Sequence, residues 1–347
     1  MSEERTTWYA TGFGTINPIG SLARPRVLVV DRHGVRFHVH RSTARTVEEM
    51  VLPAIEVAPY QPLGAPVADL AAHLRAIGAR RVGIELAGRL EARLGHADVA
   101  TLARGLELVD AAPLVWSVRA VKSPAELERI RAACAITDRA YEAGFSDVRE
   151  GMTEAEIAGV MTSALRDAGA HDGWSACVIG AGEYDRVDGV PRNRPVVRGE
   201  LVFVDMGANV GGYWADFSRS GVVGEPTAHQ QARQTAIHEV TAAGVAALRP
   251  GARACDVARE IDARMAERGL PFNNIPDRYG HGLGMVVTEP PDIWVDDDTV
   301  LRAGMVITIE PGTLDRHGIY HCEENVLVTD AEPELLSRAD WRLRGIG

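Results

Sequence analysis

Residues 200–221 read ELVFVDMGANVGGYWADFSRSG, and the order of residue types in this stretch predicts a β-hairpin. Its first half alternates residue types in the way that one face of an extended strand does. Gly211 and Gly212 are a turn signal, after which the chain can return as an antiparallel partner. Such a hairpin brings Asp205 and Asp216 close together on a largely apolar sheet.

Two neighbouring carboxylates on an apolar sheet repel each other and lose hydration, so the pair needs compensation. A shared proton is one remedy for Asp205 and Asp216, and a bound divalent cation is another. The hairpin by itself leaves both remedies open, so the rest of the chain has to supply the other members of a site.

Further carboxylates stand at the ends of apolar strands downstream. The stretch LRAGMVITIEPGT places Glu310 at the end of one strand, directly before Pro311 and Gly312. The stretch HCEENVLVTD places Glu323 and Glu324 at the start of another. These positions bring additional acidic groups to strand ends, where a site can form.

The stretch YGHGLGMVVTEPP at 279–291 sets His281 between Gly280 and Gly282. Glycine is used where the backbone must approach another group closely or adopt unusual angles. We therefore expect an exposed His281 that points at a ligand.

One imidazole and a group of strand-borne carboxylates form a candidate ligand set: Asp205, Asp216, His281, Glu310, and Glu323 or Glu324. Oxygen-rich ligands with one imidazole suit Mn²⁺, Fe²⁺, Co²⁺ or Zn²⁺. Four carboxylates balance two divalent ions, and a dinuclear site of that kind holds a bridging water or hydroxide. Each residue alone has a plainer interpretation as a strand-edge Asp, a solvated Glu or a loop His. From composition and spacing alone, a shared metal site is one hypothesis beside these plainer interpretations.

Bulk composition narrows the class of protein. The chain has 347 residues, 46% of them apolar, which predicts about two domains with sizeable cores. A net charge of −11 argues against nucleic acid as a partner. We find no apolar run of membrane-spanning length and no signal-peptide pattern, so we expect a cytoplasmic protein without a membrane partner. The four cysteines show no CxxC pairing and are expected to be reduced thiols.

The predicted pattern of helices and strands changes near Ser123. Strand-like runs alternate with helical stretches over 1–118, which predicts an α/β layer structure there. The His33, His38 and His40 group in this part is interpreted as structural. From 119 to 347, capping-box patterns begin helices between strand-like runs, which predicts an α+β domain.

The pattern as a whole resembles the pita-bread metallopeptidase family, which includes methionine aminopeptidase, aminopeptidase P, prolidase and the non-metal relative creatinase. The matching motifs are the Asp205 and Asp216 pair eleven positions apart, GHGLG, TIEPG and EENVLVT. YATGF near the N-terminus and VKSPAELERIRAA extend the resemblance over nearly the whole chain. It implies a pita-bread catalytic domain at 119–347, preceded by a shortened creatinase-like α/β domain at 1–118 in which the first strand and helix are missing.

The resemblance also implies roles for the ligand set and for two divalent metal ions, Mn, Co, Fe or Zn. Asp205 would chelate one ion, Asp216 and Glu323 would bridge both, and His281 and Glu310 would hold the second. The alignment of ENVLVT favours Glu323 over Glu324. Glu310 would act as general base beside the bridging water, and the protein would be a homodimer.

Three positions depart from the family's peptidases. Thr288 stands where a second histidine follows the ligand histidine, and Asp188 stands where a substrate-contacting histidine precedes the first Asp. His321 replaces an arginine often found two residues before the last Glu. Thr288 donates a hydrogen bond but cannot carry a positive charge, whereas an ionised Asp188 only accepts. We therefore expect a rebuilt substrate-binding shell of Asp188, Thr288 and His321, in which His321 restores one catalytic imidazole.

The leading functional prediction is a dinuclear-metal hydrolase with a metal-bridging hydroxide as nucleophile. Its substrate would be an amide or C–N bond in a short peptide, of Xaa-Pro type by resemblance, or in a small molecule. One alternative is a metal-dependent lyase, or another non-peptidase enzyme of the same fold, acting on a small metabolite. A further alternative is a non-catalytic binding module, which metal analysis would distinguish from the enzymes.

Overall fold

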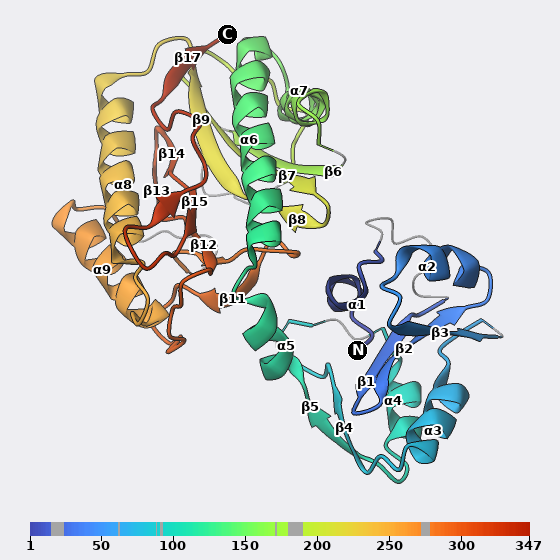
Figure 1. Cartoon of the computed structure of the whole chain (residues 1–347). Coiled ribbons are helices and arrows are strands. Elements are labelled where there is room, and N and C mark those ends of the chain that lie inside the picture. The colour runs from blue at the N-terminus through green and yellow to red at the C-terminus, as the bar shows by residue number, and fades with distance from the viewer. Residues whose placement is uncertain are drawn as a thin grey trace. The chain divides into compact units, whose positions relative to one another are not determined.

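The computed structural model forms two compact units, Met1–Val118 and Arg119–Gly347, and each is described by itself (Figure 1). The structure describes the chain except for residues 15–23, 62, 88, 91–92, 171, 180–189 and 272–277. Of residues 172–179 only the backbone is described.

The first unit combines a three-stranded sheet with a separate two-stranded one. The larger sheet has the order β1-β2-β3, in which β1 and β2 are antiparallel and β2 and β3 parallel, while β4 and β5 form a parallel pair. The strands are β1 (Val27–Asp31), β2 (Gly34–His40), β3 (Ile55–Tyr60), β4 (Arg81–Ile84) and β5 (Glu107–Asp110). The helices are α1 (Glu4–Thr11), α2 (Ala44–Met50), α3 (Val67–Ala76), α4 (His96–Leu102) and α5 (Ala112–Arg119), of which α5 ends just past the unit boundary.

Strands and helices alternate in this unit, and apolar side chains from both make two small cores. One lies around Phe37 and Val39 of β2, and the other packs Leu70 and Leu74 of α3 against Val27 of β1. The strands therefore present apolar residues on both faces, as strands in α/β layers do.

Capping boxes begin three of the long helices of the second unit. The Ser123 hydroxyl accepts from the backbone of Glu126, whose carboxylate in turn accepts from the Ser123 backbone N–H at 2.7 Å. The same reciprocal pair joins Thr153 to Glu156, and a glutamine version opens the third helix. The helices are α6 (Pro124–Asp147), α7 (Glu154–Asp167), α8 (Ala228–Ala247) and α9 (Ala254–Glu267).

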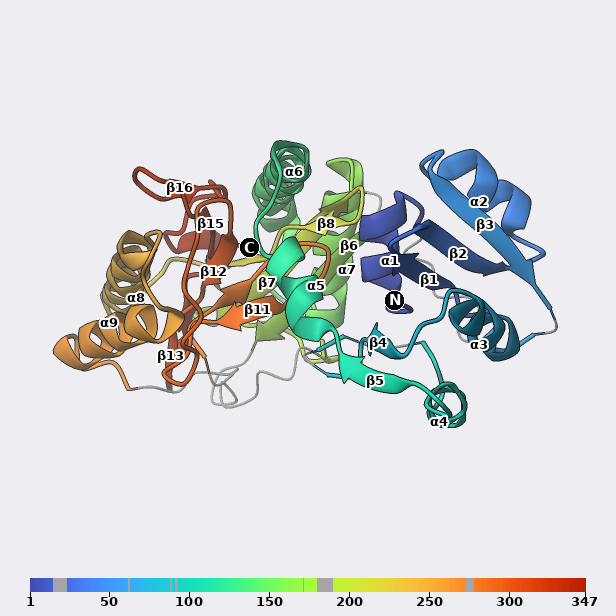
Figure 2. The same ribbon diagram turned by 60° about the horizontal axis from the view of Figure 1, so that its bottom comes forward.

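Two sheets of the second unit lie between helix pairs, with α6 and α7 on one side and α8 and α9 on the other (Figures 1 and 2). The first has the order β17-β9-β7-β6 with β8 paired to β7, and the second has the order β11-β10-β12-β15-β16. A hairpin of β13 and β14 completes the unit. Their bounds are β6 (Asp172–Ile179), β7 (Leu201–Val210), β8 (Tyr213–Trp214), β9 (Phe217–Val223), β10 (His281–Gly282), β11 (Glu289–Asp292), β12 (Val306–Ile309), β13 (Gly312–Asp315), β14 (Gly318–His321), β15 (Glu324–Leu327), β16 (Glu334–Leu335) and β17 (Arg344–Ile346).

The stretch 200–221 forms the antiparallel hairpin that its sequence predicts. Asp205 of β7 lies opposite Ser218 of β9, and the turn falls at residues 211–212. Asp216 comes directly before β9, two residues before Ser218. A Cβ on Gly207 would come within 1.7 Å of the Ala215 carbonyl oxygen, so glycine lets the two chains close up beside Asp216.

A large apolar core fixes the second unit around these sheets. It joins residues of β7, β12 and β15 to the buried faces of α8 and α9. Residues such as Val257, Ile261 and Ile307 are at most 1% exposed. In the described part of the chain, no helix is both long and apolar enough to cross a membrane.

Candidate metal centre

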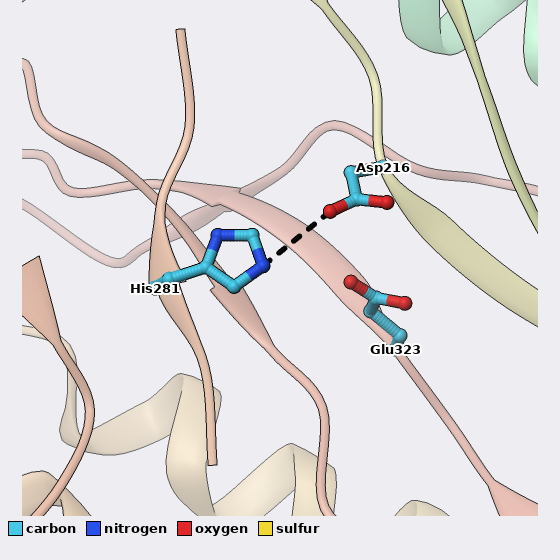
Figure 3. Close-up of side chains that lie close together, drawn as sticks. All are labelled: Asp216, His281 and Glu323. Carbon is cyan, nitrogen blue, oxygen red and sulfur yellow. Dashed lines mark ion pairs between the residues drawn. The ribbon is translucent and has the colours of Figure 1, made fainter. Parts of the chain in front are cut away.

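Three potential ligands from different strands meet in the second unit. Ligand atoms of Asp216, His281 and Glu323 all lie within 4.8 Å of one another (Figure 3). The three residues are 3%, 2% and 1% exposed. They come from the chain before β9, from β10 and from the chain before β15, so segments of two sheets build this cluster.

His281 is buried, and the expectation of an exposed histidine is wrong. Its Nδ1 lies 2.9 Å from the carbonyl oxygen of Gly282, and because a carbonyl only accepts, Nδ1 carries the proton in the neutral ring. Nε2 then has a lone pair directed at Asp216 Oδ2, 3.4 Å away, and at Glu310 Oε1, 3.6 Å away. A lone pair facing two carboxylate oxygens is the arrangement that a cation between them would stabilise.

The glycines on either side of His281 allow the neighbouring strands to approach closely. A Cβ on Gly280 would come within 2.0 Å of the Thr308 carbonyl oxygen, and one on Gly282 within 2.4 Å of the Pro290 carbonyl oxygen. Glycine therefore lets β10 lie tightly between β12 and β11, and the His281 backbone N–H donates to the Thr308 hydroxyl at 3.1 Å. The close approach inferred from the sequence exists, but the partners of the glycines are backbone carbonyls.

The other two members of the predicted set adjoin this cluster. Glu310 follows β12 directly and faces the His281 ring at the distance given above. Asp205 lies on β7, where its side chain is hydrogen-bonded to Glu323 and feels the charge of Asp216. The structure therefore brings Asp205, Asp216, His281, Glu310 and Glu323 to one buried region.

Several buried carboxylate oxygens of this region lack a hydrogen-bond partner. Among the described residues, no hydrogen bond reaches Asp205 Oδ1, Asp216 Oδ1, Glu310 Oε1 or Glu323 Oε2. Buried polar atoms are almost always hydrogen-bonded, so four orphaned oxygens in one place require another partner. Divalent cations bind carboxylate oxygens together with one imidazole nitrogen, so these residues fit a metal centre.

Burial dominates the electrostatics of the region. It raises the pKa of Asp216 to about 8 and that of Glu310 to about 7. It also raises the pKa of Asp205 and of Glu323, and the charge of Asp216 adds to both shifts. The pKa of His281 is lowered, again chiefly by burial. In the absence of a cation the carboxyls therefore tend to hold protons and the imidazole tends to be neutral.

A buried arginine explains why Glu323 rather than its neighbour faces the cluster. Arg219 binds both carboxylate oxygens of Glu324, at 3.1 and 2.9 Å, and is only 3% exposed. Its guanidinium also donates to the backbone carbonyl of Glu323 at 2.8 Å. Glu324 is thus neutralised behind the cluster, and Arg219 holds the backbone from which Glu323 projects.

Asn325 holds Asp216 in a similar way. Its Oδ1 accepts from the Asp216 backbone N–H at 2.9 Å, and its amide nitrogen donates to the Asp216 carbonyl. Neither Asn325 nor Arg219 was among the site residues predicted from the sequence. Each of the two residues lies in a run typical of a buried strand, where a charged or amide side chain needs a hydrogen-bond partner. That need was the available signal in the sequence.

The predicted substrate residues have different surroundings. Thr288 lies within 3.4 Å of Arg278, whose guanidinium also lies 3.5 Å from Glu310 and 3.6 Å from Asp292. Arg278 was not part of the predicted set, yet its charge lowers the pKa of Asp216, His281 and Glu310. Asp188 falls outside the described residues.

His321 ends β14 next to the cluster. Its Nδ1 lies 2.6 Å from the Ser218 hydroxyl, and its ring packs edge-on against Phe203 at 5.2 Å between centroids. Burial lowers its pKa to about 4, and a hydrogen bond to the backbone of Glu310 acts in the opposite direction. His321 is therefore a neutral ring that joins the β9 strand to the backbone of Glu310, and its substrate role stays a prediction.

This chain belongs to metallopeptidase family M24, whose model matches residues 128–330. It is 32% identical over 235 residues to the Xaa-Pro dipeptidase of Pyrococcus furiosus and, over the same length, to that of Pyrococcus horikoshii. Each match covers 66% of this chain and 66% of the relative, so the chain matches just under two thirds of the relatives' length.

Solved structures extend the likeness of fold over almost the whole chain. The Xaa-Pro dipeptidase from Bacillus anthracis superposes with a TM-score of 0.87, 22% identity and coverage of 99% of this chain and 93% of that one. The prolidase from Pyrococcus furiosus gives 0.83 with 25% identity, covering 97% and 95%. The predicted fold class, a pita-bread domain preceded by an α/β domain, is confirmed.

Proposed function

We propose that the protein is a metal-dependent hydrolase of short peptides, with Xaa-Pro dipeptides as the first substrates to test. The observation that carries the proposal is a buried cluster of carboxylates around His281, in which four carboxylate oxygens have no hydrogen-bond partner and the His281 Nε2 faces Asp216 and Glu310. Family membership and the names of the relatives support the substrate class.

The proposed site holds two divalent ions. Asp205, Asp216, His281, Glu310 and Glu323 would be the ligands, with Asp216 and Glu323 shared between both ions. When bound, the ions would neutralise the buried carboxylates, activate a water molecule and polarise the scissile carbonyl. Mn²⁺, Co²⁺, Fe²⁺ and Zn²⁺ all suit these ligand types.

The protein's own groups would then perform the remaining tasks. Glu310 would accept a proton from the attacking water and return it to the leaving amine. Arg278 lies beside Glu310, and Thr288 lies beside Arg278. Both would donate hydrogen bonds to the substrate in place of the family's second histidine. Arg219 and Asn325 would keep Glu323 and Asp216 in position.

Metal content and turnover of one matched pair of variants test the proposal. In Asp216→Ala, a shared carboxylate is removed, so we expect fewer bound ions by elemental analysis and loss of Xaa-Pro hydrolysis. The control is Asp256→Ala, because Asp256 is exposed on α9 and its loss should leave both quantities unchanged. Screening should cover Xaa-Pro dipeptides and small amides with Mn²⁺, Co²⁺ and Zn²⁺. Near-normal turnover in Asp216→Ala refutes the ligand assignment, and metal binding without any amide hydrolysis refutes the substrate class.

A further inference from the structure

One buried carboxylate adjoins the site without being a member of the ligand set. Glu289 begins β11 and is 1% exposed. It directly follows Thr288, whose hydroxyl lies 3.4 Å from the Arg278 guanidinium. Burying a charge is costly unless the charge is paired and hydrogen-bonded, so the partners of Glu289 show what holds it and what it holds in turn.

Two buried cations hold this carboxylate. Arg119 donates to Glu289 Oε1 at 2.6 Å, and Lys122 Nζ donates to Oε2 at 3.3 Å. The side chains of both cations are 2% exposed. The backbone of Lys122 is fixed in turn, because its N–H donates to the Gly304 carbonyl at 2.8 Å. Burial alone would raise the pKa of Glu289, but the charges of Lys122 and Arg119 outweigh it and the pKa is lowered, so the carboxyl is ionised.

The same carboxylate binds the loop of residues 283–288, which leads from β10 to β11. Glu289 Oε1 accepts from the backbone N–H of Met285 at 3.0 Å and of Val286 at 3.2 Å. The loop forms no helix or strand, and backbone N–H groups outside such elements need other acceptors when they are buried. Glu289 supplies that acceptor, so the path of the loop depends on where its carboxylate lies.

Gly284 has no room for a side chain, because the loop wraps closely around the carboxylate. A Cβ on Gly284 would come within 2.6 Å of Glu289 Oε2. The Gly284 carbonyl accepts from the Trp214 backbone N–H at 2.9 Å. The loop is thus enclosed between β8 and a carboxylate that two cations hold in place, so an added methyl group would displace the loop.

The two ends of the loop have separate anchors. Its first end follows Gly282, and the neighbouring ligand His281 is held by its own hydrogen bond to the Thr308 hydroxyl. Its last residue is Thr288, which is joined directly to Glu289. A change at Glu289 should therefore move Thr288 more than it moves His281.

We propose that Glu289 is a positioning residue, which fixes the loop 283–288 and thereby places the Thr288 hydroxyl beside Arg278. This role rests on the proposed function, in which Thr288 donates a hydrogen bond to the substrate. Glu289 acts through the backbone, because its carboxylate oxygens already bind two cations and two N–H groups. Its loss should therefore reduce turnover without reducing bound metal.

Gly284→Ala tests this role without changing any charge, and Gly159→Ala, in open space on α7, is its control. With Xaa-Pro dipeptides we expect Gly284→Ala to lower kcat at least about tenfold and to change KM less than about twofold, because a misplaced donor weakens binding of the transition state more than binding of the substrate. Bound metal, measured by elemental analysis, should stay at the level of the unmodified protein in both variants. Loss of metal in Gly284→Ala overturns the positioning role, and so does an unchanged kcat.

A double-variant cycle shows whether the loop acts through Thr288. Thr288→Val removes the hydroxyl and keeps the shape of the side chain. In that background, Gly284→Ala should lower kcat no further, since the donor that it misplaces is already absent. An equal fall of kcat in both backgrounds means that the loop acts by another route, and it overturns the proposal.

Two readouts of Glu289→Gln need no turnover. The new amide sets an NH₂ group against the buried cations, so the backbone amides of Met285 and Val286 should exchange hydrogen at least about tenfold faster, and the methyl resonance of Thr288 should shift. Glu334→Gln, which alters an exposed ion pair, should change neither. Unchanged exchange together with an unchanged Thr288 resonance in Glu289→Gln overturns the positioning role.

Failure of the proposed function gives a different result. If the unmodified protein cleaves no Xaa-Pro dipeptide, the proposed hydrolase activity is refuted, while hydrogen exchange and the Thr288 resonance still decide the role of Glu289. If the unmodified protein is active and both readouts stay unchanged, only the positioning role is refuted. Should Glu289→Gln fail to fold, the same two readouts on Gly284→Ala decide.

Discussion

Without a bound cation, raising the pH should destabilise the second unit. The pKa of Asp216 is about 8 in the folded protein against an ordinary value of 3.8. Between these two pH values, the carboxyl keeps its proton in the folded state but has released it in the unfolded state. The unfolded state therefore becomes more stable relative to the folded state as the pH rises. The free energy of unfolding must therefore fall with pH over this window, the reverse of the usual behaviour of salt-bridged carboxylates.

The structure sets the size of the effect. Each pH unit inside the window costs about 1.4 kcal/mol, so the step from about pH 5 to about pH 8 costs about 4 kcal/mol through Asp216. Glu310, with a pKa of about 7, contributes in the same direction up to that pH. The two carboxyls interact, so their contributions do not simply add. A cation that binds the deprotonated carboxylates restores about 2.7 kcal/mol at a hundredfold excess over its dissociation constant.

Urea denaturation of chelator-treated protein measures this directly. Unfolding would be followed at several pH values in that range through the fluorescence of tryptophans of the second unit such as Trp214 and Trp294, with and without Mn²⁺. Asp216→Asn should flatten the dependence on pH, and Asp256→Asn, on the exposed surface of α9, should leave it unchanged. A free energy of unfolding that is constant or rises with pH in the chelator would refute the reasoning.

Three further substitutions probe the supports of the centre. Arg219→Met leaves the buried Glu324 carboxylate without its partner, so the free energy of unfolding in urea should fall by about 3–5 kcal/mol. Arg131→Met breaks an exposed ion pair, and the free energy of unfolding should fall by less than about 1 kcal/mol. Thr288→His should raise kcat/KM for Xaa-Pro dipeptides about tenfold, and no gain would show that the missing imidazole is not what limits cleavage. Gly282→Ala sets a Cβ against a carbonyl of β11 and should reduce bound metal, while Gly159→Ala, in open space on α7, should not.

Local sequence patterns predicted the strands and helices on which the site residues lie. Alternation and the Gly211–Gly212 turn predicted the hairpin, because strand periodicity and turn chemistry are properties of neighbouring residues. Capping boxes at Ser123 and Thr153 marked helix starts for the same reason. The placement of Asp205 and Asp216 on one hairpin followed from residues only eleven positions apart.

The sequence predicted only part of the role of the glycines that flank His281. The sequence indicated a close approach around His281, but the atoms approached are carbonyls of β11 and β12, more than five residues away along the chain. Burial of His281 follows from the two strands that enclose β10. No local pattern specifies that enclosure, because it depends on which strands become neighbours in the sheet.

The amino-acid sequence by itself determined which residue types could bind a cation and on which strand ends they stand. Tertiary structure alone decided that Glu323 faces the cluster, because Arg219, over a hundred positions earlier, neutralises Glu324. It also decided that Arg278 adjoins Glu310. Periodicity and capping act over a few residues, whereas charge pairing and strand neighbours depend on how distant segments pack.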